Sequence, residues 1–456
     1  MFACFVLSSQ ADLEFAGAIT DLDKRNIALC GCGTVGSGVA SLLLEEDGAA
    51  GERFGPGLRL KYILDARVEE VRADIDAPSR LVITADQSAV LQDDDVDVVV
   101  ELFGGIDAAK ELIEQALYAG KDVVTANKAL LAEHGDELYK LARECGRSIA
   151  FEASVAGGIP IISAVRDDLV ANRIQSVYGI LNGTCNYVLT RMTKENLSYQ
   201  EALDEAQEKG YAEADPTLDV EGLDSAHKLA VLARLAFGMN VNLDDIACEG
   251  ISEVAVDDLN YARRLGYSLK LLAVGMRSQD GIDLRVHPTL LRHSHPLSAV
   301  SGAYNAVCVH GDMVGETVFT GLGAGRNPTA SAVVADIYRV ALGTYGQTFR
   351  TLNRFGELPD AAMVPFEDVM TRYYFRLGCL DRPGVLAQVA GIMGEEDISI
   401  SSCIQQDLPA EGEEHVPVVF MTHKAREGDV QQALRRINKL ECIDGSRTHM
   451  LRVQDI

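Results

Sequence analysis

The sequence is short of positive charge, of long apolar runs and of paired cysteines. Its 41 Lys and Arg stand against 68 Asp and Glu, a formal net charge of -27, so the average surface repels nucleic acids and anionic membranes. No stretch approaches the roughly 20 consecutive apolar residues that a membrane-spanning helix needs. We therefore expect neither a nucleic-acid partner nor a membrane partner.

Ten cysteines occur without any C-x-x-C pair, and several of them, such as Cys185 and Cys308, lie in apolar segments. This usage is typical of reduced, buried thiols. Cys30 and Cys32 flank Gly31 in a glycine-rich turn, where a metal site is not expected. Residues 1–25 lack a basic start and soon become acidic, so we interpret them as an extension rather than a signal peptide. These features predict a cytoplasmic protein.

The composition, with 47% hydrophobic residues, 24% charged residues and 41 Gly, is that of a folded α/β protein. At about 100 to 200 residues per domain, the 456 residues suggest three domains. Alternating strands and helices predict a Rossmann-type doubly wound parallel sheet, and longer helices mixed with strands predict an α+β domain for substrate and dimerisation. A βαββαβ pattern predicts a ferredoxin-like C-terminal module. The expected boundaries are 26–151 for the sheet, 152–326 for the substrate domain, 327–345 for a helix returning to the first domain, 346–370 for a linker and 371–456 for the module.

Cofactor binding is indicated by GCGTVGSGV, which follows an apolar strand and opens a helix. Gly31 permits the tight turn, Gly33 lets the backbone approach a pyrophosphate, and Gly36 lets the helix pack on the strand. The amides of Thr34 and Val35, at the helix N-terminus, would face the phosphates. The motif predicts NAD or NADP as the cofactor.

Three further positions lie at strand ends, where an open α/β sheet binds its ligand. LKYILDAR carries Asp65, an acceptor for the 2′-hydroxyl of NAD, and Arg67, a partner for the 2′-phosphate of NADP, so the preference stays open. The loop EDGAAGERFGPG explains the long spacing between the glycine turn and Asp65. Gly104 in ELFGG would admit the nicotinamide ribose or simply start a helix, and Lys128 in TANK would be a surface charge or a contact to cofactor or substrate.

A second polar cluster lies in GYAEADPTLDVEGLDSAHKL, where carboxylates crowd a Gly- and Pro-containing loop before an apolar helix. Asp224 and Lys228 are spaced i, i+4 and therefore share one helix face. Taken alone, the pair is typical of a solvated salt bridge with an N-capping acid. The neighbouring Glu213, Asp215 and Asp219 favour a site that grips a substrate ammonium while the lysine delivers a proton.

Six segments, in order over about 27–342, resemble the homoserine dehydrogenase family: GCGTVGSGV, TANKALL, EASVAGGIPII, LNGTCNYVL, GYAEADPTLDVEGLDSAHKL and GLGAGRNPTASAVVADI. The resemblance implies reversible NAD(P)H-dependent reduction of L-aspartate 4-semialdehyde to L-homoserine, in threonine, methionine and isoleucine biosynthesis. It implies that Lys228 is the proton donor and that Lys128 is a second catalytic or cofactor-contacting lysine. Glu213 would bind the substrate amino group, and Asp219 and Asp224 would orient the substrate and the lysine.

The resemblance also implies two ligand sites near glycines. Gly323 and Gly325 of GLGAG would lie at the nicotinamide end of the cofactor. A monovalent cation, sodium, would be held by oxygen ligands of Glu152, Val155, Gly157 and Ile159, a donor set that suits a hard ion. From the residues alone, this stretch is a glycine-rich domain crossing.

LDRPGVLAQVAGIMGEEDISI resembles the opening of an ACT domain. The resemblance implies that Asp381 and Gly384 bind an amino acid, threonine, at an interface between chains of a homodimer or homotetramer. The alternative is that the module only dimerises.

The sequence suggests two alternatives to this enzyme, and neither needs all of the residues that are present. A catalytically silent sensor of cofactor and amino acid would not need to keep Lys128, Lys228, Glu213 and Asp219, and another amino-acid dehydrogenase would not need GYAEADP or LNGTCN. His293 and His295 in LRHSHP have no acidic cluster beside them in the sequence, so we interpret them as loop residues rather than as a metal pair.

Overall fold

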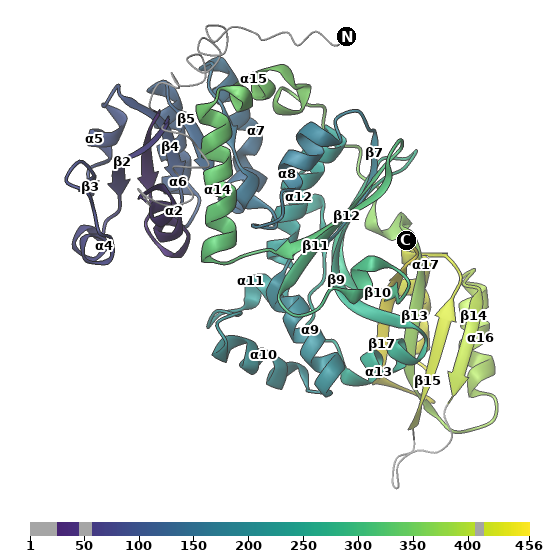
Figure 1. Ribbon diagram of the computed structural model, residues 1–456. Coiled ribbons are helices and arrows are strands. Elements are labelled where there is room, and N and C mark those ends of the chain that lie inside the picture. Colours follow the sequence, from purple (N-terminus) through teal and green to yellow (C-terminus); the bar gives the residue numbers. More distant parts are fainter. Residues whose placement is uncertain (1–24, 45–56, 406–414) are drawn as a thin grey trace, which may run out of the picture. The chain divides into compact units, whose positions relative to one another are not determined.

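The computed structural model describes residues 25–44, 57–405 and 415–456 (Figure 1). The extension before Arg25, most of the loop EDGAAGERFGPG and most of the acidic insert LPAEGEEHVP lie outside these residues. The chain divides into two compact units, one formed by the residues up to Ile162 with Ala324–Leu358 and one formed by Ser163–Gly323 with Pro359–Ile456. Each unit is described by itself.

The first unit is built on a sheet of six parallel strands in the order β3-β2-β1-β4-β5-β6. The chain starts in the middle and extends first to one edge and then to the other, which is the doubly wound order that places a ligand at the carboxyl ends of the central strands. The predicted Rossmann-type sheet is therefore confirmed. The strands are β1 (Arg25–Cys30), β2 (Leu58–Leu64), β3 (Val82–Thr84), β4 (Val96–Glu101), β5 (Asp122–Thr125) and β6 (Ile149–Ala150).

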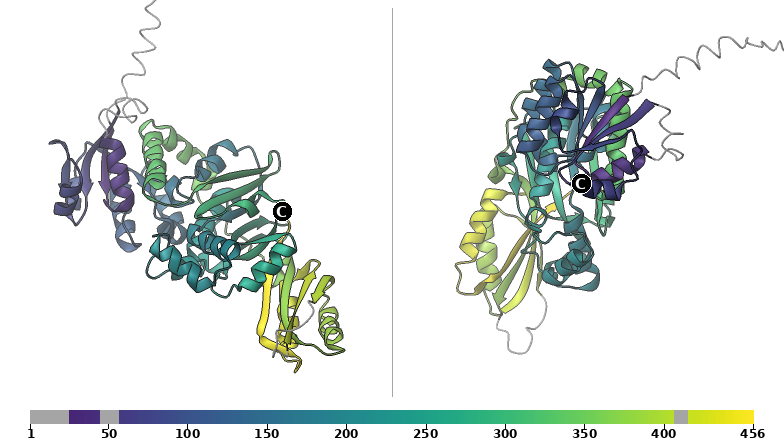
Figure 2. Two further views of the ribbon diagram at one scale, coloured as in Figure 1. Left: turned by 60° about the horizontal axis from the view of Figure 1, so that its bottom comes forward. Right: turned by 90° about the vertical axis from the view of Figure 1, so that its left-hand side faces the viewer.

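Helices cover both faces of this sheet, with α6 and α7 on one face and α2 and α14 on the other (Figure 2). Arg326, at the start of α14, donates a hydrogen bond of 3.1 Å to the hydroxyl of Ser37 on α2. The segment expected as a linker begins inside a further helix, α15, whose Tyr345 and Phe349 are buried. The helices are α2 (Thr34–Leu44), α4 (Val68–Asp74), α5 (Gln87–Leu91), α6 (Asp107–Tyr118), α7 (Lys128–Glu144), α14 (Arg326–Ala341) and α15 (Thr344–Thr351).

The second unit is built on a mixed sheet of eleven strands with the main order β12-β11-β7-β9-β10-β17-β13-β15-β14. Its first part is the predicted α+β domain, in which α9, α12 and α13 pack on the strands. The strands of this part are β7 (Ile174–Ile180), β8 (Ala247–Cys248), β9 (Tyr267–Arg277), β10 (Ile282–Arg292), β11 (Tyr304–Gly311) and β12 (Gly315–Leu322). The helices are α9 (Gly183–Glu195), α10 (Tyr199–Glu208), α11 (Thr217–Val220), α12 (Leu223–Phe237) and α13 (Val256–Arg264).

The C-terminal module has the predicted βαββαβ order and its own apolar core, which includes Phe375, Val389 and Val430. Its last strand, β17, pairs in parallel with β10, so the module continues the sheet of the preceding domain instead of hanging from a linker (Figure 1). The elements are β13 (Met370–Leu380), α16 (Val385–Glu395), β14 (Ile400–Gln405), β15 (His415–Thr422), the short β16 (Ala425–Arg426), α17 (Glu427–Ile437) and β17 (Ile443–Gln454).

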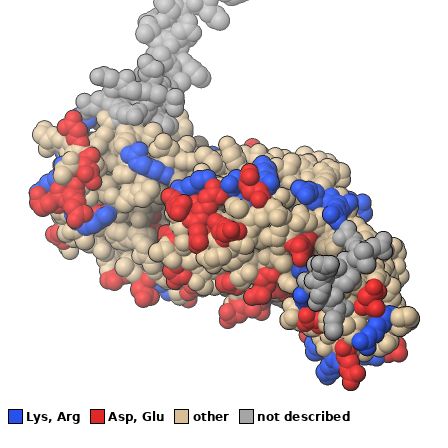
Figure 3. All heavy atoms as spheres, turned by 90° about the horizontal axis from the view of Figure 1, so that it is seen from below, with Lys and Arg blue, Asp and Glu red and all other residues tan. Residues whose placement is uncertain are grey.

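The surface agrees with the acidic composition, since acidic side chains are spread widely over the face shown in Figure 3. Over the described ranges, no helix is both long and apolar enough to cross a bilayer. The nine cysteines within those ranges are all free thiols, and most of them are buried or half-buried.

Candidate active site

The glycine turn of the first unit has the shape that a dinucleotide needs. Gly31 has φ +96°, and a Cβ on it would lie 2.7 Å from the carbonyl oxygen of Leu102. A Cβ on Gly36 would lie 2.1 Å from the carbonyl oxygen of Gly31, so α2 could not approach the strand with any other residue there. A Cβ on Gly33 would meet open space. The turn therefore leaves room above Gly33 at the N-terminus of α2, where helix amides favour an anion.

Asp65 and Arg67, the two predicted ribose contacts, are bound to each other. The carboxylate of Asp65 accepts hydrogen bonds from the Cys32 amide at 2.8 Å and from the Arg67 amide at 2.9 Å. The Arg67 guanidinium donates to both carboxylate oxygens at 3.1 Å and remains 53% exposed. Burial alone would raise the pKa of Asp65, but the hydrogen bonds from Arg67 and Cys32 lower it to about 2. Asp65 thus stays anionic and holds Arg67 beside the glycine turn.

The carboxyl end of β4 holds a buried carboxylate that the sequence did not single out. Glu101 is fully buried, and it accepts hydrogen bonds from the hydroxyl of Thr125 at 2.5 Å and from the amide of Phe103 at 2.7 Å. Burial raises the pKa of Glu101 to about 7. Gly104, two residues beyond Leu102, would carry a Cβ into open space, and half-buried Lys128 begins α7. These predicted cofactor positions therefore lie at the ligand-binding edge of the sheet.

In the second unit, the predicted catalytic pair forms a buried ion pair on α12. The Lys228 ammonium donates to Oδ2 of Asp224 at 2.6 Å and to the carbonyl oxygen of Leu181 at 2.7 Å. Both side chains are about one-tenth exposed, at 11% for the lysine and 9% for the aspartate. The interpretation as a solvated salt bridge is wrong, because a surface pair would not be desolvated in this way.

Asp219, on the short helix α11, faces the same cluster. Burial, and then the nearby charge of Asp224, raise the pKa of Asp219. Asn182 bridges the two carboxylates, since its side-chain amide donates to Asp219 at 2.7 Å and to Asp224 at 2.9 Å. The hydroxyl of Thr184 has one proton, which it shares between the Tyr211 carbonyl at 2.6 Å and the Asp219 carboxylate at 3.0 Å. The structure thus joins the predicted Asp219, Asp224 and Lys228 in one network.

Asn182 and Thr184 are the site residues that the sequence analysis missed. Both belong to LNGTCN, a segment noted there only for its resemblance to the family. Asn182 also caps α9, because its side-chain oxygen accepts from the amide of Cys185 at 2.8 Å. A polar motif that caps a helix gives no local sign that its side chains also bridge distant carboxylates.

Two other acidic residues of the loop lie outside this network. Glu213 is exposed, and its described contact is through its backbone carbonyl, which accepts from Gln207 at 3.0 Å. Asp215 caps the local turn by accepting from Thr217. An exposed carboxylate at this loop is accessible to a ligand, but the chain itself does not orient it.

Gly323 and Gly325 of GLGAG are required as glycines for different structural reasons. A Cβ on Gly323 would lie 2.1 Å from the side chain of Asn305 in the second unit, so close packing requires this glycine. Gly325, in the first unit, has φ +115° and precedes the first residue of α14. Each glycine permits a tight local arrangement.

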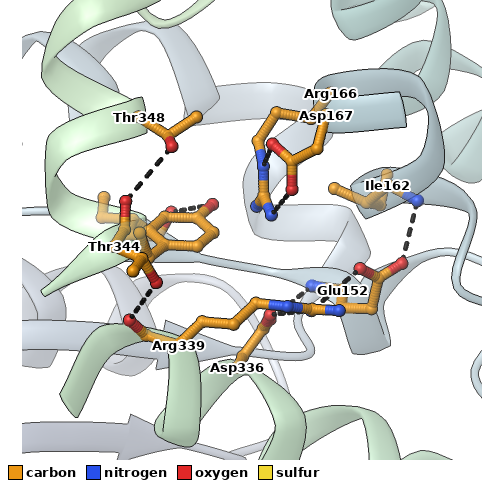
Figure 4. Close-up of polar contacts among 10 residues, drawn as sticks. Glu152, Ile162, Arg166, Asp167, Asp336, Arg339, Thr344 and Thr348 are labelled. Carbon is orange, nitrogen blue, oxygen red and sulfur yellow. Dashed lines mark hydrogen bonds and ion pairs between the residues drawn. The ribbon is translucent and has the colours of Figure 1, made fainter. Parts of the chain in front are cut away.

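The predicted cation turn is organised around Glu152, which is 3% exposed (Figure 4). Its carboxylate accepts from the amide of Ile162 at 2.8 Å and lies 3.4 Å from the guanidinium of Arg339. Its own amide donates to Asp336 at 2.7 Å, and Arg339 pairs with Asp336 at 3.2 Å. The carboxylate charge is therefore already shared with an arginine.

The carbonyl oxygens are the other predicted ligands of this turn. The Ile159 carbonyl accepts from the amide of Ile161 at 2.7 Å. Gly157 has φ +36° and follows Ala156, whose φ of +54° is in the left-handed region. Two consecutive residues with positive φ therefore make a tight turn between Val155 and Ile159.

The turn of the C-terminal module between β13 and α16 borders a cavity of about 310 Å³. Gly384 has φ +92° and precedes α16. Asp381 accepts from the side-chain amide of Gln405 on β14 at 3.4 Å. Both predicted regulatory residues line the cavity.

His295 lies with Cys308 and Glu316 in a group whose donor atoms are within 4.8 Å of one another. Its Nδ1 accepts from the amide of Leu297 at 3.2 Å, so the neutral ring carries its proton on Nε2. Nε2 is buried and has no hydrogen-bond partner among the described residues. A protonated nitrogen is a donor and not a metal ligand, so we assign no metal to this group.

Taken together, a doubly wound sheet with an open glycine turn and a buried lysine paired with a carboxylate define the chain as an NAD(P)-dependent dehydrogenase with a C-terminal ACT module. Sequence models of known families match three segments: "Homoserine dehydrogenase, NAD binding domain" over 31–152, "Homoserine dehydrogenase" over 160–338 and "ACT domain" over 373–442. The chain belongs to the homoserine dehydrogenase family.

Individual relatives agree over almost the whole length. The homoserine dehydrogenase of Pseudomonas aeruginosa is 44% identical, over 92% of this chain and 96% of the relative, and that of Neisseria gonorrhoeae is 41% identical, over 94% and 99%. A crystal structure of a homoserine dehydrogenase from Thiobacillus denitrificans has a TM-score of 0.88 at 40% identity and covers 95% of this chain and 99% of that chain. A hyperthermophilic archaeal homoserine dehydrogenase in complex with NADPH has a TM-score of 0.60 at 28% identity, over 70% and 98%. The predicted enzyme class is confirmed.

Proposed function

We propose that Lys228 is the group that protonates the carbonyl oxygen of aspartate semialdehyde when homoserine is formed. The observation that carries this proposal is the position of its ammonium, which is buried, anchored by Asp224 and Leu181, and adjacent to the polar network of Asp219. Bound NAD(P)H supplies the hydride. As the carbonyl carbon gains the hydride, the oxygen gains negative charge, which a neighbouring ammonium stabilises and then neutralises by giving up a proton.

Asp224 and Asp219 act in different ways in this proposal. Asp224 fixes the direction of the lysine side chain, since it accepts from the ammonium at 2.6 Å. Asp219 is a fixed carboxylate, held by Asn182 and Thr184, that attracts the substrate ammonium. Glu213, exposed on the same loop, supplies a second carboxylate for that ammonium. A small substrate with a carbonyl and an ammonium is recognised at both ends in this way.

The decisive assay is reduction of aspartate semialdehyde by the Lys228→Ala variant. We expect turnover to fall by orders of magnitude while NAD(P)H still binds, as measured by the fluorescence of the nicotinamide. Near-normal turnover of the variant would refute the assignment of Lys228.

For the cofactor, we propose that the pyrophosphate lies over Gly33 at the N-terminus of α2, with the amides of Thr34 and Val35 facing it. Arg67 is favoured as the contact to a 2′-phosphate, because Asp65 holds it beside the turn while leaving it half-exposed. Gly104, Gly323, Gly325 and Lys128 are proposed as contacts toward the nicotinamide end. Comparing KM for NADH and NADPH tests the preference.

We further propose that the turn around Glu152 holds a monovalent cation such as sodium, through carbonyl oxygens of Val155, Gly157 and Ile159, with the carboxylate shared between the ion and Arg339. The ion would fix the turn and takes no part in the chemical step. Activity and melting temperature in sodium chloride, compared with choline chloride of equal ionic strength, test this site.

Threonine is the proposed effector of the C-terminal module, bound at the cavity that Asp381 and Gly384 border. The volume of about 310 Å³ is at the lower end of small-molecule pockets, which suits an amino acid. If the module only dimerises the protein, threonine will not change the rate. We also propose a homodimer or homotetramer, which light scattering tests. The free thiols of the described residues favour a reducing compartment, and we propose the cytoplasm.

A further inference from the structure

A buried arginine joins the C-terminal module to the part of the preceding domain that packs on α11. Arg452 on β17 is 2% exposed, and its guanidinium forms a bidentate ion pair with each of two carboxylates. It donates to Glu427 of the module at 2.7 and 2.8 Å, and to Glu249 of the preceding domain at 2.7 and 2.8 Å. Pairs with this geometry fix the relative positions of three chain segments, because both donor edges of the guanidinium are used.

On the module side, this arginine belongs to the strands that lead to the effector cavity. Arg452 is in register with Tyr373 on β13, and the Tyr373 hydroxyl donates to Glu427 at 2.8 Å. β13 continues to Leu380, directly before Asp381 at the cavity. A change at that turn therefore acts on the strand that pairs with the arginine.

On the catalytic side, Glu249 begins a segment that packs directly on the backbone around Val220. The amide of Ile251 donates to the Val220 carbonyl at 2.8 Å, and the thiol of Cys248 donates to the Glu221 carbonyl at 3.3 Å. A Cβ on Gly250 would lie 2.3 Å from the Val220 oxygen, so the two backbones are in contact.

Val220 is the residue after Asp219 and the last residue of α11. Two residues later, Gly222, with φ +85°, begins the turn into α12, which carries Asp224 and Lys228. A displacement of Glu249 is therefore passed through one hydrogen-bonded backbone contact to the carboxylate proposed to hold the substrate ammonium.

We propose that the Arg452–Glu249 ion pair is the joint through which the ACT module sets the position of Asp219, and that Arg452 and Glu249 are positioning residues for the reaction. The proposal rests on the proposed function, since it uses Asp219 as a substrate contact and the cavity at Asp381 as the effector site. It adds the physical connection between those two sites. Coupling through a contiguous packed network of this kind typically changes affinities by a modest factor and does not abolish activity.

The test uses the full-length Glu249→Ala variant. Glu249 is 48% exposed, and Arg452 keeps Glu427 as its partner, so the substitution leaves no unpaired charge in the core. We expect KM for aspartate semialdehyde to rise roughly three- to tenfold, with kcat within about twofold of the original value. Glu249→Gln, which keeps the volume and part of the hydrogen bonding, should give an intermediate KM.

Asp455→Asn is the matched control. Asp455 lies 3.6 Å from Arg292 on β10 and 3.2 Å from Arg372 on β13, so it also joins the module to the preceding domain, but at an exposed end of the strands. This variant should keep both KM and kcat. Melting temperatures of all variants are compared, and Glu249→Gln carries the test if Glu249→Ala is unstable.

Hydrogen exchange and calorimetry complete the test. Amides of 217–223 should exchange faster in Glu249→Ala and not in Asp455→Asn. If calorimetry shows that Glu249→Ala still binds threonine while the inhibition weakens, the joint is supported. If KM, exchange and threonine inhibition all match the unaltered protein, the joint is refuted. If the unaltered protein binds no threonine, the effector assignment fails by itself, and KM and exchange alone decide the joint.

Discussion

The ammonium of Lys228 lies 2.6 Å from Oδ2 of Asp224, one helical turn earlier on α12. The same ammonium donates to the Leu181 carbonyl at 2.7 Å. A lysine ammonium has three donors, so these two acceptors fix its direction and leave one hydrogen for an external oxygen. A carbonyl oxygen that becomes negative during reduction is the acceptor that this arrangement suits.

Lys228→Met should therefore remove the proton donor while keeping the apolar stem. We expect kcat/KM for aspartate semialdehyde to fall by about 10²- to 10⁴-fold, the usual contribution of general acid catalysis. Steady-state assays with NADH and NADPH measure the effect. Lys439→Met, at an exposed position of the C-terminal module, is the control and should be unchanged.

The reverse reaction depends on pH because it produces a proton. Oxidation of homoserine releases one proton for each hydride transferred, and in the proposed mechanism Lys228 takes it from the hydroxyl. We therefore expect the oxidation rate to rise toward alkaline pH and the Lys228→Met variant to lose this rise. A pH profile of the same slope in both proteins would show that another group takes the proton.

Thr184→Val should weaken substrate binding more than turnover. The substitution removes the hydroxyl that lies 3.0 Å from the Asp219 carboxylate. Burial already raises the pKa of Asp219, and the variant leaves this carboxylate with one hydrogen-bond donor fewer. We expect KM for aspartate semialdehyde to rise roughly tenfold, since a hydrogen bond to a charged group contributes about 1.5 to 3 kcal/mol. Thr184→Ser keeps the hydroxyl and should remain near the original KM. Equal KM values for the two variants would contradict the role of the hydroxyl.

Arg67→Ala should discriminate between the two cofactors. If Arg67 binds the 2′-phosphate, the variant will raise KM for NADPH by about tenfold or more and leave KM for NADH nearly unchanged, because only NADPH carries that group. Arg72→Ala, at an exposed arginine on α4 that pairs with Glu69, is the control. An equal rise in KM for NADPH and NADH would show instead that Arg67 stabilises the fold of the turn.

Glu101 predicts how stability depends on pH. Burial raises its pKa from 4.5 to about 7, so between these values the folded protein keeps a proton that the unfolded chain has released. Its contribution is therefore fully present below about pH 4.5 and is lost as the pH rises through 7. The free energy of unfolding of the cofactor-free protein, measured in urea, should fall more between pH 5 and pH 8 in the unaltered chain than in Glu101→Gln. The two falls should differ by at most about 3 kcal/mol, and equal falls would contradict the raised pKa.

Much of the fold was predictable because its signals are local. The glycine turn after β1, the strand and helix order of the first unit and the βαββαβ module all follow from residues close together in the chain. The i, i+4 spacing likewise predicted that Asp224 and Lys228 face each other. Their burial was not predictable, because spacing along a helix does not say what covers it, so the sequence left a solvated salt bridge open as an alternative.

The sequence by itself therefore determined the class of fold, the glycine turn, the shared helix face of Asp224 and Lys228, and the family. Only the tertiary structure decided that Asn182 bridges Asp219 and Asp224, which lie 37 and 42 residues further along the chain. It alone decided that Arg452 meets Glu249 across 203 residues. The physical reason is the same in both cases: the packing of strands and helices sets which distant side chains meet, and no local pattern of residues encodes that packing.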